Sequence, residues 1–178
     1  NYNASLYLSL KKTPEFIHKS KLVLGVEKIP FSNIFPFLET LAIQNGGTSG
    51  TLGVESEASI FQDKDFEGKG FGLAPVVCYE SIYGAYLADQ TKKGSNLICI
   101  LTNDGWWGDS PGYKQHFSFS RLRAIENRRW VVRSANTGYS GVIDDYGTIL
   151  KQTNYWEEAV FSNSVPLKYS TTFYVKWG

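Results

Sequence analysis

The spacing of apolar and polar residues changes several times along the chain, and each spacing predicts a different element. Alternation predicts β-strands at residues 2–10 and 15–25, with a break between them at residues 11–14. Shorter, mostly apolar runs predict further strands, the second and third buried on both faces: residues 58–62, 69–80 and 95–104. The last third of the chain returns to strand-like spacing in four segments: residues 130–136, 139–145, 147–153 and 157–165.

Helical spacing separates these strands at three places. Residues 33–47 predict a short helix that ends at glycines, and residues 81–93 predict a second helix that also stops at a glycine. The clearest helix covers residues 109–129, where Ser110 can cap the first turn and Pro111 takes the first helical position. Strands that alternate with helices and then give way to hairpins favour an α/β layered domain. A chain of 178 residues suits one domain of this kind.

Composition narrows the function classes only slightly. A net charge of +1 gives no reason to expect nucleic acid as a partner, because such binding needs a clustered basic surface. No run reaches the roughly 18 apolar residues of a membrane span. Aromatic residues make up 15% of the chain, a surplus that fits an apolar ligand site or a membrane-facing surface. Two cysteines and two histidines offer no ligand cluster, so we expect neither a metal nor a cofactor.

Candidate chemistry begins at Cys78, which ends an apolar run and precedes a helical segment. In open α/β sheets, sites gather beyond the carboxyl ends of strands, where the following backbone N–H groups can stabilise an oxyanion. The pattern alone leaves Cys78 as either a nucleophile or a core thiol, and predicts that Cys99 is a core residue. The two histidines, His18 and His116, leave a Cys–His hydrolase open, although His116 fits a surface or core position equally well.

Four stretches of the sequence carry a resemblance to a known family. They are HKSKLVLGVEKIP (18–30), VVCYESIYG (76–84), LTNDGWWGDSPGYKQHFSFSRLRAIENRR (101–129) and VVRSANTGYSGVIDDYGTI (131–149). In this order and spacing they resemble the apolipoprotein N-acyltransferases, the membrane-bound branch of the nitrilase, or carbon–nitrogen hydrolase, superfamily. The resemblance runs from Tyr2 to the end. It is weakest near Glu27, where Leu24 and Val26 replace the family's usual proline and glycine.

The resemblance implies a nitrilase-like αββα sandwich with a Glu–Lys–Cys triad. By motif, Cys78 matches the nucleophile and Lys19 the triad lysine. An ammonium group near a thiol favours the thiolate and, together with the Tyr79 N–H, can stabilise the oxyanion. Glu27 and Glu80 match two further acids of this branch. We expect Glu27 to orient or polarise the site and Glu80 to hold Lys19 or a neighbouring loop, a solvated surface charge being the alternative for each.

The resemblance also implies residues that face the substrate. Four residues match positions lining the site: Tyr79, Asn103, Trp106 and Trp107. The paired tryptophans suit an acyl-chain wall or a contact at the membrane edge, and structural packing of one of them is an equal alternative. Three further residues are expected to serve the scaffold without taking part in chemistry: Arg133, Asn136 and Asp144.

Parts of the family pattern have no counterpart in residues 1–178. The family's general base is a glutamate several tens of residues before the lysine, and Glu15 is too close to Lys19 to match it. The family also carries transmembrane helices before this domain and one more after it. The chain begins at Asn1 and contains no methionine. We therefore expect residues 1–178 to be the C-terminal portion of a catalytic domain within a longer protein, and to be inactive alone.

For the whole protein, the resemblance implies transfer of a fatty acyl chain from a phospholipid to the N-terminal amine of a diacylglyceryl-cysteine apolipoprotein, through a thioester on Cys78. It implies a bacterial inner-membrane protein whose catalytic domain lies on the periplasmic side. The expected partners are the phospholipid, the apolipoprotein and the membrane. Two alternatives stay open: a soluble nitrilase-type amidase or carbamoylase, and a non-catalytic nitrilase-like domain. The motif CYESIYG and the aromatic surplus favour the acyltransferase.

Overall fold

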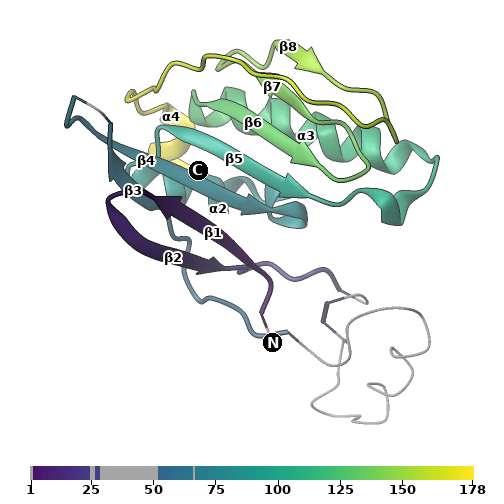
Figure 1. Cartoon of the computed structure of the whole chain (residues 1–178), viewed down its shortest axis with the longest axis horizontal. Helices are drawn as coiled ribbons and strands as arrows, with labels where there is room; N and C mark the ends of the chain where they lie inside the picture. The colour runs from purple at the N-terminus through teal and green to yellow at the C-terminus, as the bar shows by residue number, and fades with distance from the viewer. Residues whose placement is uncertain (1, 25–26, 29–51, 66) are drawn as a thin grey trace.

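The computed structural model describes residues 2–24, 27–28, 52–65 and 67–178. These residues form a six-stranded sheet, a separate two-stranded sheet and a layer of helices (Figure 1). The helix predicted at residues 33–47 lies outside the described ranges.

The six-stranded sheet has parallel strands at its centre. They are β4 (Gly70–Val77), β5 (Leu97–Thr102) and β6 (Trp130–Ala135). Antiparallel strands flank them: β3 (Phe61–Lys64) beside β4, and then β7 (Gly141–Ile143) and β8 (Ile149–Gln152) beyond β6. The register pairs the last residue of β4 with Leu101 and the last residue of β5 with the last of β6. The carboxyl ends of the three parallel strands therefore meet at one edge.

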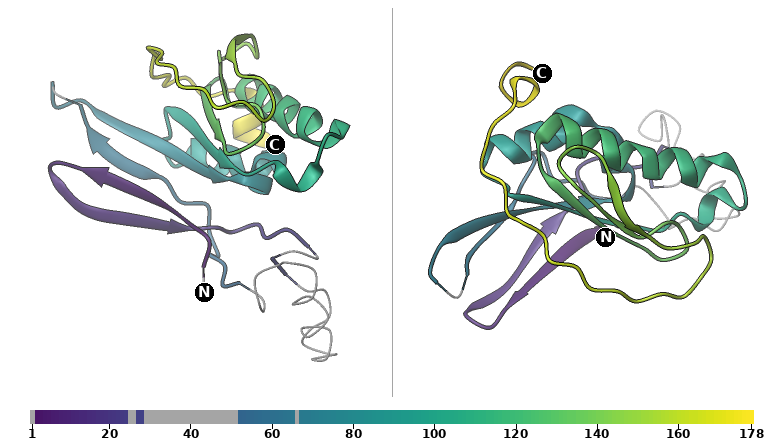
Figure 2. Two further views of the ribbon diagram at one scale, coloured as in Figure 1. Left: turned by 45° about the vertical axis from the view of Figure 1, so that its right-hand side comes forward. Right: turned by 90° about the horizontal axis from the view of Figure 1, so that it is seen from above.

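Helices cover one face of this sheet (Figure 2). They are α2 (Gly84–Lys92), α3 (Pro111–Asn127) and the short α4 (Phe173–Trp177). Aliphatic side chains from both layers are fully or almost fully buried between them, among them Val76, Leu87, Ile98, Ile100 and Val131. Each such side chain contributes about 1.5–3 kcal/mol to folding, so this core holds the strand ends in register.

The two-stranded sheet packs on the opposite face of the large sheet (Figure 2). It is an antiparallel hairpin of β1 (Ala4–Ser9) and β2 (Lys12–His18). The Tyr7 hydroxyl donates to Asp63 over 2.9 Å, and its ring stacks on Phe61 of β3. Helices, sheet and second sheet are three successive layers of the predicted αββα sandwich. Among the described residues, no helix covers the outer face of the hairpin, where Leu8 and Phe16 are exposed.

Several predicted boundaries were wrong. The hairpin turns at residues 10–11, so residues 12–14, predicted as a break, belong to β2, and β2 ends at His18 rather than at residue 25. The helix predicted at residues 81–93 begins as a 3₁₀ turn, Cys78–Ile82, and becomes α-helical at Gly84. Residues 157–165, predicted as a strand, form none, because no described strand pairs with them, and Val160 is 99% exposed.

Other predictions were confirmed. Ser110 caps α3 by accepting a hydrogen bond from the Gly112 N–H, and Pro111 is its first residue. Gly94, with φ +102°, ends the turn after α2. None of the helices in the described ranges combines the length and the apolar character that crossing a membrane requires.

Candidate active site

Cys78 directly follows β4 and opens the 3₁₀ turn. Its φ is +53°, in the left-handed region that residues with a Cβ rarely adopt. Such a conformation costs on the order of 1–3 kcal/mol and persists only where surrounding contacts enforce it, typically at functional sites. The residue is partly exposed and faces a cavity of about 360 Å³, lined also by Asn3, Glu27, Leu101, Asn103 and Trp106. This geometry presents a thiol at the strand edge.

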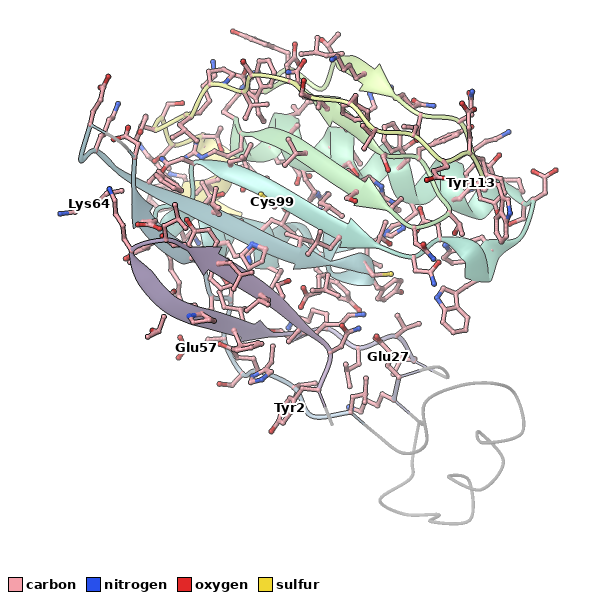
Figure 3. The ribbon with its side chains drawn as sticks, in the orientation of Figure 1. Tyr2, Glu27, Glu57, Lys64, Cys99 and Tyr113 are labelled. Carbon is pink, nitrogen blue, oxygen red and sulfur yellow. The ribbon has the colours of Figure 1, made fainter. Side chains whose placement is uncertain are left out.

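Lys19 follows β2 and is only 1% exposed. Its ammonium nitrogen lies 2.9 and 2.7 Å from the two carboxylate oxygens of Glu27. Glu27 also accepts hydrogen bonds from the Asn3 side chain (3.0 Å) and the Val23 N–H (2.8 Å). In Figure 3, Glu27 lies between the end of the hairpin and the strand ends of the large sheet. A buried lysine is thus fixed beside the cavity that holds Cys78.

Glu27 is held as a carboxylate by these contacts. Burial by itself would raise the pKa of Glu27, but the hydrogen bonds from Lys19, Val23 and Asn3 and the charge of Lys19 outweigh it and lower the pKa. The buried lysine and the partly exposed glutamate therefore form an ion pair. The expectation that Glu27 orients the site agrees with this placement.

The lowered pKa of Glu27 predicts an acid-sensitive contribution to stability. Because the folded pKa lies below the ordinary 4.5, the ionised pair stabilises the fold above that pH, and the contribution is lost as the pH falls through the folded pKa. In the full-length protein, Glu27→Gln should lower the melting temperature at neutral pH. The deficit should shrink as the pH falls below 4.5. Thermal unfolding across this range measures it, and a deficit independent of pH would contradict the assignment.

Glu80 is buried and bonds to the backbone rather than to Lys19. One carboxylate oxygen accepts from the N–H groups of Ser20 (2.6 Å) and Lys21 (3.3 Å), and the other accepts from the Val77 N–H (2.8 Å). Burial raises the pKa of Glu80 and these three bonds only partly offset the effect. Of the two contacts expected for Glu80, the structure shows the one with the neighbouring loop. Glu80 ties the segment after Lys19 to the end of β4.

The two tryptophans differ in their surroundings. Trp106 lines the Cys78 cavity and is largely exposed. Trp107 packs over the first turn of α3, where a Cβ on Gly112 would come within 2.5 Å of the indole ring. The two alternatives, lining the site and structural packing, therefore apply to different tryptophans. Trp106 contributes to the cavity wall, and Trp107 packs against the scaffold.

Asn103 and Tyr79 are the other residues expected near substrate. Asn103 lines the cavity, and its side-chain oxygen accepts from the Gly105 N–H (3.0 Å) and the Thr137 hydroxyl (3.2 Å), which fixes the amide. The Tyr79 ring packs edge-on against Tyr83, with centroids 5.6 Å apart, beside the cavity lining rather than within it. Of these two residues, only Asn103 is found in the cavity lining.

Sequence reasoning missed a buried polar cluster behind Cys78. The Arg133 guanidinium donates to one oxygen of Asp104 over 2.7 Å, and His116 Nδ1 lies 2.8 Å from the other. Burial would raise the pKa of Asp104, but the hydrogen bond from His116 and the charge of Arg133 lower it. The predicted scaffold role of Arg133 agrees with this burial. No spacing rule signals the cluster, because its members come from the end of β5, α3 and β6.

The histidines do not form a catalytic pair with Cys78. Both ring nitrogens of His116 are engaged, Nδ1 by Asp104 and Nε2 by Ser81 and the Cys78 carbonyl. Neither is free for the thiol. His18 packs against Tyr2, with ring centroids 4.3 Å apart and ring planes tilted by 34°. The Cys–His alternative therefore has no support in this geometry.

Cys99 lies midway along β5, away from the strand ends (Figure 3). It is partly buried rather than a full core residue as predicted. Burial raises the pKa of its thiol to about 12, so the sulfur stays protonated at neutral pH. Cys99 therefore does not compete with Cys78 as a thiolate nucleophile.

Comparison with known proteins extends over nearly the whole chain. The profile of the carbon–nitrogen hydrolase family matches residues 2–173. The apolipoprotein N-acyltransferase of Chlorobaculum tepidum is 38% identical over 174 residues, which cover 97% of this chain and 32% of that protein. The enzyme of the same name from Rickettsia prowazekii is 34% identical, covering 90% of this chain and 31% of its own. The chain thus spans about a third of the length of these curated relatives.

Solved structures share the fold at lower sequence identity. Saccharomyces cerevisiae Nit3, a member of branch 10 of the nitrilase superfamily, superimposes with a TM-score of 0.59 at 18% identity, covering 88% of this chain and 51% of that one. The Caenorhabditis elegans NitFhit protein gives a TM-score of 0.57 at 19% identity, and the match covers 86% of this chain and 35% of that protein. At this identity the likeness shows the arrangement of layers alone.

Proposed function

The chain belongs to the carbon–nitrogen hydrolase family, and on this premise we propose that it is the later part of a catalytic domain that transfers a fatty acyl chain from a phospholipid to the N-terminal amine of an apolipoprotein. The observation that carries the proposal is Cys78, held in a left-handed turn at a strand end and facing the cavity beside the Lys19–Glu27 pair. The names of the relatives support this acyl transfer over other chemistry of the family.

The proposed reaction proceeds in two steps through Cys78. The thiolate sulfur attacks the ester carbonyl carbon of the phospholipid, a carbon–sulfur bond forms, and the carbon–oxygen bond breaks to release the lysophospholipid, which takes up the proton. The amine nitrogen of the apolipoprotein then attacks the thioester carbonyl carbon, a carbon–nitrogen bond forms and the carbon–sulfur bond breaks, and the proton lost by the amine returns the sulfur to the thiol. The general base that moves these protons is a glutamate that we place in the part of the protein outside residues 1–178.

Each neighbouring residue has a role in this proposal. Lys19 supplies positive charge to the developing oxyanion, with the Tyr79 N–H as a second donor. Glu27 fixes the lysine, and Glu80 fixes the loop that carries it. Trp106 forms part of the wall against which an acyl chain lies. The proposed location is the bacterial inner membrane, with this domain on the periplasmic side, where phospholipid and apolipoprotein meet.

Incubation of the full-length protein in detergent with phosphatidylethanolamine tests the proposal. Intact-mass spectrometry should reveal a fatty acyl adduct that neutral hydroxylamine removes, since thioesters react with it. A parallel incubation with a small aliphatic amide should release no ammonia. Ammonia release without an acyl adduct would instead establish an amidase. If neither the adduct nor ammonia forms, the domain is non-catalytic.

A further inference from the structure

A buried chain of hydrogen bonds ends at the backbone of Cys78. Asp104 contacts His116 Nδ1, and His116 Nε2 lies 2.8 Å from the Ser81 hydroxyl oxygen. Ser81 donates to the Cys78 carbonyl oxygen over 2.8 Å, and His116 Nε2 lies 3.2 Å from the same oxygen. Two polar groups thus converge on one carbonyl directly beneath the nucleophile.

These hydrogen bonds connect the same residue types as a Ser–His–Asp triad, but the three residues cannot act as one. Ser81 is 0% exposed, so no external substrate reaches its hydroxyl. Its proton is directed at the Cys78 carbonyl instead of at the histidine. The three hydrogen-bonded residues therefore act on the backbone of Cys78 rather than on a substrate.

Holding a carbonyl also sets the direction of the next N–H. The peptide bond between Cys78 and Tyr79 is trans, so its C=O and N–H point in opposite directions. With the C=O held toward Ser81 and His116, the Tyr79 N–H points away from α3. Tyr79 lies in the first turn of a 3₁₀ helix, where an N–H has no acceptor within the helix. Within the part of the chain that the structure describes, no other acceptor engages this N–H, which leaves it available to a ligand.

We propose that Ser81, His116 and Asp104 are positioning residues that fix the peptide between Cys78 and Tyr79 and so aim the Tyr79 N–H at the oxyanion formed during acyl transfer. The inference rests on the proposed nucleophilic function of Cys78. It also accounts for the φ of +53°, because the bonds to the carbonyl keep the residue in a conformation it would otherwise leave. Arg133 anchors the chain by its bonds to Asp104 and to the Tyr139 carbonyl.

Two reactions of Cys78 distinguish a misdirected Tyr79 N–H from general damage to the site. Acylation by p-nitrophenyl butyrate passes through an oxyanion, whereas alkylation by iodoacetamide does not. In the full-length protein, Ser81→Ala should slow acylation roughly 10- to 100-fold, somewhat less than the loss of a whole oxyanion donor, and change alkylation by less than about twofold. His116→Leu should do the same. His116→Gln, whose amide can still donate toward the carbonyl, should recover most of the acylation rate.

Thr91→Val is the matched control, because it removes a buried hydroxyl bond, to Asn127 over 2.9 Å, in another part of the helical layer. Both rates should stay at the wild-type value. If Ser81→Ala slows acylation and alkylation equally, or slows neither, the positioning role is overturned while the nucleophile stands. If the wild-type protein is not acylated at Cys78 at all, the proposed function and this inference are both overturned.

Discussion

Replacing Cys78 with alanine in the full-length protein is expected to abolish the hydroxylamine-sensitive acyl adduct completely, because in the proposed reaction its sulfur forms the thioester. Alanine also has a Cβ, so at φ +53° it bears the same backbone strain as cysteine. The fold should therefore survive the change. Intact-mass spectrometry after incubation with phosphatidylethanolamine measures the adduct, and thermal unfolding verifies that the variant is folded.

Cys99→Ser is the control for this experiment. Its sulfur stays protonated, with a pKa of about 12, and it lies within β5 rather than at the strand edge. The adduct should persist in this variant at the wild-type level. An adduct that survives Cys78→Ala and disappears with Cys99→Ser would reverse the assignment of the nucleophile.

The sequence predicted elements well where local signals agreed with one another. The cap at Ser110, the proline after it and the helical spacing all specified α3, and the apolar runs specified β4 and β5. Prediction failed where distant partners decide the outcome. Residues 157–165 alternate as a strand would, yet no described strand lies where they could pair. The strand β2 ends at His18, and the next residue, Lys19, pairs with Glu27, a contact that the local alternation does not signal.

The candidate site shows the same division. Motif matching selected Cys78, Lys19, Glu27 and Glu80 as candidates, and the structure brings them together beyond the end of β4. It missed His116 and Asp104 as partners because their contacts depend on how α3 packs against the end of β5. It also missed Asn3, whose side chain bonds to Glu27 and whose carbonyl accepts from the Lys19 N–H over 2.7 Å. Such contacts join residues distant in sequence and follow from the fold rather than from any local pattern.

Lys19→Ala is expected to slow formation of the acyl-enzyme about 10³-fold in single-turnover kinetics of the full-length protein, because the proposed reaction uses the positive charge of Lys19 to stabilise the developing oxyanion. It should also destabilise the protein by about 3 kcal/mol, since Glu27 is left as a carboxylate without its buried partner. Lys11→Met, which changes an exposed lysine in the hairpin turn, should affect neither quantity.

A double variant separates these two consequences of losing Lys19. Adding Glu27→Gln to Lys19→Ala removes the unpaired carboxylate, so most of the lost stability should return. The acylation rate should remain low, because the amide supplies no positive charge to the oxyanion. If the double variant instead regained the rate together with the stability, Lys19 would serve only to neutralise Glu27. Stabilisation of the negative oxyanion would then fall to another group, and among the site residues of this chain that group would be the Tyr79 N–H.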